Sequence, residues 1–410
     1  MGIFSGRRRA ARRTGFDRPG PARVAAVDYE VEQARRLIAE GRPTEAEQQL
    51  VALLLDRQAA LSGDDPRLYD TRLAYAAAVL GLGRRDEAAA MFDATVDECS
   101  GRFGAGHPQT LLAIVRRAEG RAVAGRPEEA AADTQAVLAE CAGGTYAGHT
   151  VALVRTMARQ VNAVAVGQAG RHREALAAYD AMLPDLARQW GAESAAVLVC
   201  RANRVQQLAV LGQFREAEGE ALALLATAGR LADTGAAADA LTLSAAAANG
   251  LAFTLTESGR AGEAELELRA PLARMERREG QGGQFVSALR LNLVNSLNAQ
   301  GRFDEALAEA ELLPADDPRQ VGGPALARAE ALHGLGRTEE AERAAEEALS
   351  KCAAAYSPVH SRVLRARTLL ATIQTSPADL ASAAADWHTH FGPTHPRTLA
   401  AQAAADALTD

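Results

Sequence analysis

The sequence predicts an all-α fold built from repeated helical hairpins, and two observations support this prediction. The first is a six-residue pattern, Gly-Arg-x-x-Glu-Ala, that occurs eight times, with Gln213 in place of the arginine in one copy, and with spacings of 42, 42, 45, 42, 47, 42 and 35 residues. Such self-similarity is the signature of stacked repeats, in which each unit packs only against its neighbours. The second is composition: 48% of the residues are hydrophobic but only 4% are aromatic. Alanine therefore supplies much of the apolar content, which favours closely packed helices. The pattern begins at Gly41, Gly83, Gly125, Gly170, Gly212, Gly259, Gly301 and Gly336.

The glycine of the pattern separates two helices in each unit, an A helix before it and a B helix after it. In the seventh unit, Val294 and Leu297 belong to an apolar series at helical spacing that stops at Gly301. A glycine just beyond the last turn adopts the left-handed conformation at little cost and ends the helix. Glu305 then places a carboxylate in the first turn of the B helix, where the helix dipole favours it. Ala306 lets the two helices approach closely, so each unit is predicted to be a hairpin with a short turn.

The chain divides into three predicted regions. Residues 1–27 form an Arg-rich arm without apolar periodicity, which we expect to be disordered. Residues 28–357 hold the eight hairpins. Residues 358–410 hold a degenerate repeat and a capping helix, because the rhythm fades after Gly336 and a terminal unit of a solenoid lacks a neighbour on one face.

The arm is basic, whereas the rest of the chain is acidic. Residues 1–23 contain seven arginines and one aspartate, a charge of +6, so the remainder carries −13 within a net charge of −7. This asymmetry is typical of weak contact with an anionic partner, either nucleic acid or lipid. The alternative is a disordered leader that aids solubility. The arginines assigned to this contact are Arg7, Arg8, Arg9, Arg12 and Arg13.

Signatures of catalysis and membrane insertion do not occur in the sequence. Lys351 is the sole lysine, which excludes a phosphate loop ending in Gly-Lys-Ser or Gly-Lys-Thr. Zinc motifs and the Gly-x-Ser-x-Gly elbow are missing, so we predict no catalytic residue, no metal and no cofactor. A metal at His388, His390 and His395 is the alternative to a capping or surface role. With no run of about 18 apolar residues and no Cys-x-x-Cys pair, we expect a cytoplasmic protein without a transmembrane segment.

The hairpin with a glycine in its turn and an alanine five residues later resembles the tetratricopeptide repeat (TPR). A period near 42, and linkers at 104–111 and 392–399 that share His-Pro-x-Thr-Leu, are similar to the kinesin-light-chain-like subtype of that family. The resemblance covers roughly residues 28–408 and implies a right-handed superhelical solenoid. The excess of alanine and arginine is typical of a GC-rich genome, for which we expect an actinobacterial source.

The resemblance also implies where a ligand would bind, because A helices line the concave groove of such a solenoid. Side chains ten, six and three residues before the glycine are expected to point into the groove. Amides in these slots can donate to and accept from a peptide backbone whatever its sequence, and nearby arginines can bind carboxylates. The alternative is hydrogen bonding between hairpins for the amides and a solvated face for the arginines. The predicted groove residues are Gln160, Gln206, Asn249, Phe253, Asn295, Asn298, Arg201 and Arg290.

The predicted function is a non-catalytic scaffold that binds a protein or peptide in its concave groove, in a regulatory or assembly role. One alternative is a peptide-responsive regulator that changes its superhelical pitch on binding. A second, from another class, is an enzyme or an enzyme accessory subunit with a site made in the groove.

Overall fold

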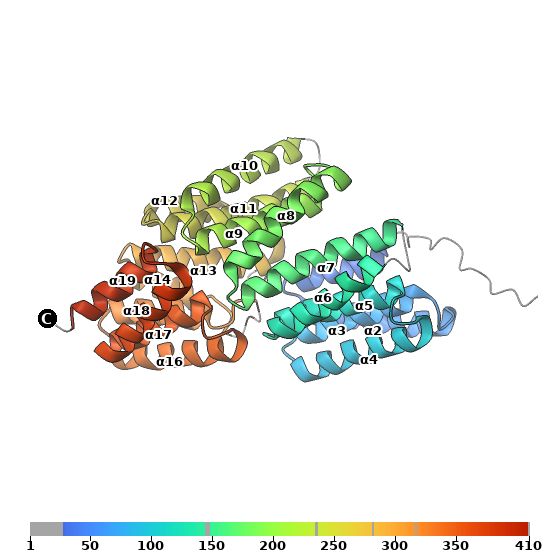
Figure 1. Cartoon of the computed structure of the whole chain (residues 1–410), viewed down its shortest axis with the longest axis horizontal. Coiled ribbons are helices and arrows are strands. Elements are labelled where there is room, and N and C mark those ends of the chain that lie inside the picture. Colours follow the sequence, from blue (N-terminus) through green and yellow to red (C-terminus); the bar gives the residue numbers. More distant parts are fainter. Residues whose placement is uncertain are drawn as a thin grey trace, which may run out of the picture.

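The computed structural model describes residues 28–143, 148–233, 237–280, 283–315, 317 and 319–408. All regular structure in these residues is helical, and nineteen α-helices follow one another along the chain (Figure 1). The helices are α1 (Tyr29–Ala39), α2 (Pro43–Ala60), α3 (Pro66–Gly81), α4 (Arg85–Phe103), α5 (Pro108–Val123), α6 (Pro127–Gly143), α7 (His149–Gln168), α8 (His172–Trp190), α9 (Ala195–Val210), α10 (Phe214–Asp233), α11 (Ala237–Glu257), α12 (Ala261–Glu279), α13 (Gln284–Ala299), α14 (Phe303–Ala310), α15 (Gly323–Gly334), α16 (Thr338–Ala355), α17 (Ser361–Ile373), α18 (Pro377–Phe391) and α19 (Pro396–Asp406).

The repeated glycine ends the A helix of each hairpin, as the sequence pattern predicts. All eight pattern glycines have φ between +72° and +86°, the left-handed region that a side chain disfavours. In the first hairpin, Arg42 N–H donates to Leu37 O at 2.8 Å and Gly41 N–H donates to Ile38 O at 3.2 Å. These bonds satisfy carbonyls that would otherwise be orphaned at the helix end. The B helix begins one or two residues later, so consecutive helices pack antiparallel.

The arginine and glutamate of the pattern form an ion pair at the start of the B helix in seven hairpins. In the seventh, Arg302 Nε lies 2.7 Å from Glu305 Oε1 and Arg302 Nη2 lies 2.6 Å from Glu305 Oε2. The same arginine reaches Glu265, in the preceding B helix, at 2.5 Å. Equivalent bridges join Arg84 to Glu47 and Arg260 to Glu218. The pattern thus links neighbouring B helices laterally, in addition to shaping each turn.

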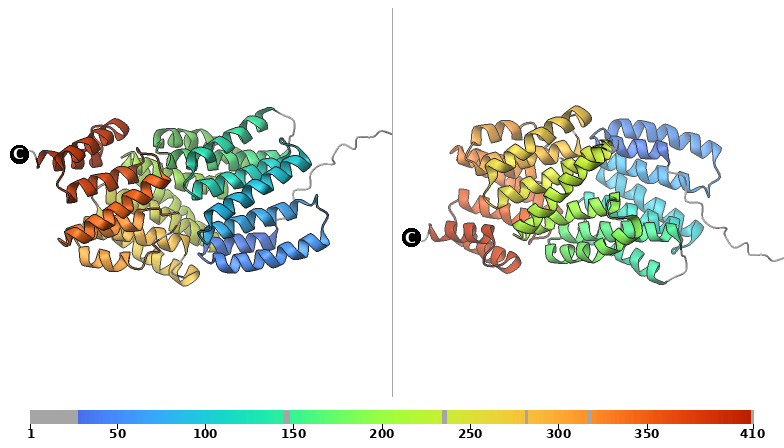
Figure 2. Two further views of the ribbon diagram at one scale, coloured as in Figure 1. Left: turned by 90° about the horizontal axis from the view of Figure 1, so that it is seen from below. Right: turned by 90° about the horizontal axis from the view of Figure 1, so that it is seen from above.

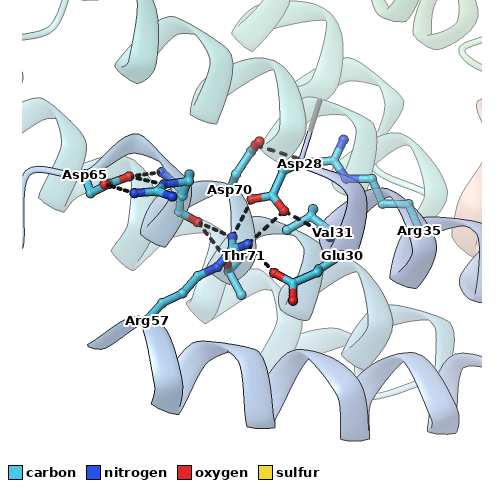
Figure 3. A network of polar contacts seen from close by, with 9 residues as sticks. Asp28, Glu30, Val31, Arg35, Arg57, Asp65, Asp70 and Thr71 are labelled. Atoms are coloured by element: carbon cyan, nitrogen blue, oxygen red, sulfur yellow. Dashed lines mark hydrogen bonds and ion pairs between the residues drawn. The ribbon is translucent and has the colours of Figure 1, made fainter. Parts of the chain in front are cut away.

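A buried arginine fixes the first hairpin against the second (Figure 3). Arg57 of α2 is 8% exposed, and its Nη2 donates to Asp28 Oδ1 at 2.8 Å while its Nη1 donates to Thr71 Oγ1, on α3, at 2.8 Å. Asp28 also caps α1 by accepting from Val31 N–H. Burial alone would raise the pKa of Asp28, but the hydrogen bond and charge of Arg57 hold it below its ordinary value. One guanidinium therefore connects three helices at the start of the array.

The His-Pro-x-Thr-Leu linkers owe their shape to two side chains. His107 and His395 are N-cap residues whose Nδ1 atoms accept from the backbone N–H two residues later, at 3.1 and 3.2 Å. The threonines of the two linkers, Thr110 and Thr398, donate back to the carbonyls of Gly104 and Gly392. The motif therefore starts the next A helix in a fixed direction.

The solenoid turns far enough for its later linkers to contact its earlier hairpin turns (Figures 1 and 2). Arg319, between α14 and α15, donates to Ile38 O at 3.5 Å. Ser357, between α16 and α17, donates to Ala169 O at 2.6 Å, and His395 lies 3.1 Å from Val210 O. Helices α16–α19 are thereby brought back against the middle of the array, and we call this set of contacts the closure.

The core runs along the array as a series of clusters made mainly of alanine, leucine and valine. The alanine that follows the pattern glutamate is fully buried in most hairpins, as at Ala46, Ala217 and Ala306. Its small size lets the helix backbones approach closely. Within the ranges described, no helix is both long enough and apolar enough to span a bilayer.

Thr375 marks the ninth hairpin, where the turn has lost its glycine. Its φ is +49°, and among the residues that the structure describes it is the one non-glycine residue with a positive φ. A β-branched residue is strained there by about 1–2 kcal/mol. Thr375→Gly removes this strain, but the larger entropy of glycine in the unfolded chain offsets part of the gain. We therefore expect the substitution to stabilise the protein by about 1 kcal/mol. Urea unfolding followed by circular dichroism measures the change.

The reverse substitution is the control for this prediction. Gly336 has φ +72°, and a Cβ added at this position would meet nothing within 4 Å. Gly336→Thr should therefore destabilise by about 1–2 kcal/mol through backbone strain alone. A Thr375→Gly variant no more stable than the parent would show that the ninth turn does not hold this conformation in solution.

Candidate functional site

A chamber of about 300 Å³ lies between the middle A helices and the returning C-terminal units. One wall consists of residues from α7, α9, α11 and α13, and the opposite wall comes from the linkers and helices after α14. The closure therefore converts the concave side of this part of the solenoid into a half-open cavity. The polar and aromatic residues around it include Tyr179, Gln206, Asn249, Phe253, Asn295, Arg319, Tyr356, His360, Arg362 and Arg397.

Four of the eight predicted groove residues line this chamber: Gln206, Asn249, Phe253 and Asn295. Gln206, Phe253 and Asn295 occupy the same slot, six residues before the pattern glycine, on the successive helices α9, α11 and α13. Within the described chain, the side-chain amides of Gln206 and Asn295 make no hydrogen bond. Asn249 Oδ1 accepts from Asn292 Nδ2 at 2.8 Å. The chamber wall thus carries amide groups with unused hydrogen-bonding capacity.

The other four predicted residues make contacts within the array. Gln160 Nε2 donates to Ala196 O, in the following hairpin, at 3.0 Å, and Asn298 Nδ2 donates to Ala327 O at 2.8 Å. These two amides connect neighbouring hairpins.

Arg201 and Arg290 share a slot eleven residues before the glycine, and each pairs with a glutamate of its own B helix. Arg201 lies 3.0 Å from Glu220, and Arg290 lies 3.0 Å from Glu309. Arg290 is also 3% exposed. The structure therefore places both guanidinium groups between the helices of a hairpin and not on the chamber wall.

The wall opposite the amides was not found by sequence reasoning. It contains Tyr356, His360, Arg362 and Arg397, which lie on or beside the last two linkers. Tyr356 stacks on His360 with ring centroids 4.2 Å apart, and Arg362 Nη1 lies 3.2 Å from Tyr356 Oη. The sequence signal available for this wall was the linker motif, which identified His395 as a linker residue but gave no long-range neighbour.

A half-buried ion pair crosses the closure at the edge of the chamber. Arg397 of α19 bonds both carboxylate oxygens of Glu257 of α11, at 2.9 and 2.6 Å. Burial alone would raise the pKa of Glu257, but the charge and hydrogen bonds of Arg397 lower it to about 2. Such a pair is bidentate and geometrically specific, so it fixes how α19 sits against α11.

Two imidazoles meet where the linker before α17 reaches the turn after α7. His172 is 5% exposed, with Nδ1 at 2.9 Å from Gln207 Oε1 and a ring centroid 5.5 Å from that of His360. His360 Nδ1 accepts from Arg362 N–H, so its Nε2 carries the proton. Burial lowers the pKa of both rings, and the neighbouring His172 and Arg362 act in the same direction on His360. Both imidazoles are therefore held neutral.

Metal binding and cysteine chemistry gain no support from the described residues. Among them, no three His, Cys, Asp or Glu side chains are grouped so as to hold a metal ion. His395, one of the three histidines of the metal alternative, stacks on Trp387 at 5.7 Å. All four cysteines are free, and burial raises the pKa of Cys99 and Cys200 to about 12, which keeps both as thiols. The Arg-rich arm, with Arg7, Arg8, Arg9, Arg12 and Arg13, lies outside the described residues.

The chain was compared with known families, curated proteins and solved structures. No protein-family model matches it, and no curated protein matches it. The apo form of the quorum sensor NprR from B. thuringiensis is 12% identical, with 94% of this chain and 99% of that chain covered and a TM-score of 0.51. The nearly identical TPR-like repeats attributed to a kinesin light chain of Podosopora anserina are 21% identical over 50% of this chain and 95% of that chain (TM-score 0.37). Yeast Tom70 is 10% identical over 93% and 95% (TM-score 0.28).

These observations confirm the predicted fold class. Eight hairpins with a left-handed glycine in each turn, and a structural match over nearly the whole chain, define an all-α superhelical solenoid of TPR hairpins. The identities are low, so the likeness concerns the fold alone. The kinesin-light-chain-like subtype and the actinobacterial source stay predictions.

The closure can be tested with two matched glycine substitutions. Gly170 and Gly83 have nearly the same φ, +82° and +80°, but a Cβ on Gly170 would lie 2.8 Å from Ser357 Oγ and 3.2 Å from His360 N, whereas a Cβ on Gly83 meets nothing within 4 Å. Gly83→Ala should therefore cost about 1–2 kcal/mol of stability. Gly170→Ala should cost about 1–3 kcal/mol more, because the linker must also shift. Urea unfolding measures both, and equal losses would show that this contact does not form in solution.

The buried imidazole of His172 and the half-buried imidazole of His360 predict a dependence of stability on pH. Because their folded pKa values lie below the unfolded value of about 6.5, the unfolded chain binds more protons in mild acid. The contribution of the two rings to the free energy of unfolding is thus complete above about pH 6.5. It is lost as the pH falls towards 5, by up to about 1.4 kcal/mol per pH unit for each ring. Glu279, whose pKa burial raises, acts in the opposite sense.

The variant for this test is His360→Asn, which keeps a side-chain acceptor at the N-cap of α17. Thermal unfolding between pH 5 and 7 should show a shallower slope for this variant than for the parent. His388→Asn, at an exposed position, should leave the slope unchanged. Identical slopes for His360→Asn and the parent would contradict the assignment.

Proposed function

We propose that the protein is a non-catalytic binding scaffold whose ligand is a short peptide segment held in the chamber. The observation that carries the proposal is the convergence of Gln206, Asn249 and Asn295, from three successive A helices, on one cavity. Gln206 and Asn295 have no hydrogen-bond partner among the described residues. An amide left without a partner on a concave wall is an available donor and acceptor.

The chemistry of this wall suits a peptide backbone. Each peptide unit offers one N–H and one C=O, and a side-chain amide can bond to both without reading the side chain. Phe253 on the same wall and Tyr356 on the opposite one add apolar ring surface. Pockets that combine aromatic surface with a few convergent polar groups are typical ligand sites.

The size of the chamber limits the ligand. A volume of about 300 Å³ is at the low end of the range of about 300–1,000 Å³ for ligand pockets. The chamber therefore takes a segment of a few residues and not a helix lying along the whole groove. Binding into preformed walls orders the ligand more than the receptor, which lowers the entropic cost of association.

The closure favours one variant of this function, a regulator whose pitch responds to its ligand. A ligand longer than the chamber has to separate linkers from hairpin turns, at contacts such as Ser357 to Ala169 and Arg397 to Glu257. Binding and superhelical pitch would then be linked, since a ligand shifts an equilibrium by its differential affinity for the two states. A change in small-angle scattering on adding the bound peptide would support this variant, and an unchanged profile would count against it.

The proposed function predicts the effect of two substitutions on the same helix. An array of random pentapeptides identifies ligands of the wild-type protein, and titration calorimetry then measures their affinity. Asn295→Ala should weaken binding about fivefold to tenfold, as expected for the loss of one or two hydrogen bonds. Asn298→Ala is the matched control, because its amide donates to Ala327 O outside the chamber, and it should leave affinity unchanged.

Two outcomes would contradict the proposal. If no peptide in the array binds the wild-type protein, the ligand class is wrong. If Asn295→Ala and Asn298→Ala bind selected peptides as tightly as the parent, the chamber is not the site. Circular dichroism checks that both variants keep their helix content.

A further inference from the structure

The charged groups around the chamber do not balance. Four guanidinium groups line it, from Arg319, Arg362, Arg365 and Arg397, whereas Glu257 is the one acidic residue of the lining. The carboxylate of Glu257 is already paired with the guanidinium of Arg397.

The charge of Arg365 is paired with a carboxylate outside the chamber lining, because its Nη2 lies 2.9 Å from Glu330 Oε1. Two carboxylates thus neutralise two of the four guanidinium groups. Within the described chain, no carboxylate lies within ion-pair distance of Arg319 or Arg362, so neither guanidinium has a direct ion-pair partner.

Neutral oxygen atoms hold Arg362 in place. Its Nη1 donates to Val321 O at 3.2 Å, and its Nη2 lies 3.4 Å from Gln320 Oε1. Its guanidinium carbon also lies 5.7 Å from the centroid of the Tyr356 ring. The guanidinium is therefore oriented by the linker that precedes α15, with its charge uncompensated.

Arg319 lies on the same linker as Val321. Its Nη2 donates to Ile38 O at 3.5 Å, and within the described chain this long bond to a neutral carbonyl is the one hydrogen bond of the guanidinium. The backbone N–H of Arg319 donates separately to Asp317 Oδ1 at 2.9 Å. Burial lowers the pKa of this guanidinium, although Asp317 and Glu279 act at longer range in the opposite direction. A poorly solvated cation with most of its five N–H donors unused is costly unless an anion accompanies it.

We propose that Arg319 and Arg362 form an anion subsite of the chamber, which binds a carboxylate or phosphate group of the ligand. The planar fork of a guanidinium matches either group with two parallel hydrogen bonds. The subsite adjoins the amide wall, because Asn295 and both arginines line the same cavity. This inference rests on the proposed function for the remainder of the ligand, which the amides hold, and it adds that the ligand is anionic at one end.

The position of the subsite couples it to the closure. Arg319 contacts the first hairpin at Ile38, and Arg362 lies in the first turn of α17, directly after the N-cap residue His360 and the first helical residue Ser361. An anion bridging the two arginines would therefore join the N-terminal and C-terminal parts of the array through one ligand group. Ligand binding is then expected to stabilise the closed solenoid, since whatever binds the folded form alone stabilises it by mass action.

The test uses the full chain with two simple probes, inorganic phosphate and succinate, at matched ionic strength so that general screening is constant. Both the rise in unfolding temperature and the dissociation constant are measured. The wild type should show saturable stabilisation by at least one probe. The Arg319→Gln/Arg362→Gln double variant should bind that probe at least tenfold more weakly, as expected for two lost charge-assisted contacts. Arg328→Gln, at an exposed position on α15 outside the chamber, should match the wild type.

A second arm separates the two sources of the anion. A pentapeptide selected on the array is compared as the free acid and as the C-terminal amide. Preference for the free acid that is lost in Arg362→Gln assigns a peptide carboxylate to the subsite. Equal binding of acid and amide, together with arginine-dependent phosphate binding, assigns a phosphate group.

The outcomes distinguish this inference from the proposed function. Peptide binding that depends on Asn295 but not on Arg319 or Arg362, with no saturable effect of either anion, overturns the subsite alone. Anion binding that depends on the arginines, without any peptide binding, supports the subsite and overturns the peptide scaffold. Because glutamine retains hydrogen-bonding capacity and removes an uncompensated charge, the double variant should unfold at or above the parent's temperature without probe, which checks that it folds.

Discussion

The contact between hairpin turns and later linkers is the constraint on which the chamber depends. A pattern glycine has no Cβ, so the turn presents bare backbone to whatever approaches it. At Gly170 the approaching group is the linker at Ser357 and His360, and at Gly212 it is the ring of His395. Without these approaches the inner face of the middle hairpins would be an open groove. The glycine that sequence analysis assigns to helix termination therefore has a second structural role, since it permits one part of the solenoid to seat on another.

Local features of this fold could be predicted from the sequence, and long-range ones could not. The eight turns and the slot six residues before each glycine follow from helical periodicity within one repeat. Gln206, Phe253 and Asn295, which share that slot, all line the chamber, and their role in binding stays a prediction. Asn298 lies one turn further along the same face, but there the next hairpin is close enough to take its hydrogen bond. The returning wall was missed because the closure depends on small rotations between hairpins that accumulate over the whole array. No residue pattern near Arg362 indicates how far these accumulated rotations bring the later linkers back towards the earlier hairpins.

Polar groups inside the solenoid are divided between those that hold the structure and those that remain available. Arg57 and Arg290 are buried against carboxylates, and the half-buried Arg397 is paired with Glu257. The loss of either partner in such pairs would leave a charge without compensation. Arg362 and Asn295 face the chamber without comparable partners. Arg57 and Arg290 are satisfied by carboxylates of the same or a neighbouring hairpin, and Arg397 is satisfied across the closure at the edge of the chamber.

The lateral Arg–Glu bridges do not join every pair of neighbouring B helices. They connect the first hairpin with the second through Arg84, the third with the fourth through Arg171, and the fifth, sixth and seventh through Arg260 and Arg302. The fifth hairpin has Gln213 in place of the arginine, so its junction with the fourth lacks such a bridge. Other side chains join these two hairpins: Arg204 of α9 lies 2.6 Å from Asp180 of α8, and Gln207 of α9 lies 2.9 Å from His172 of α8. The loss of the arginine at position 213 therefore moves the polar link from the outer B helices to the A helix that also carries part of the amide wall.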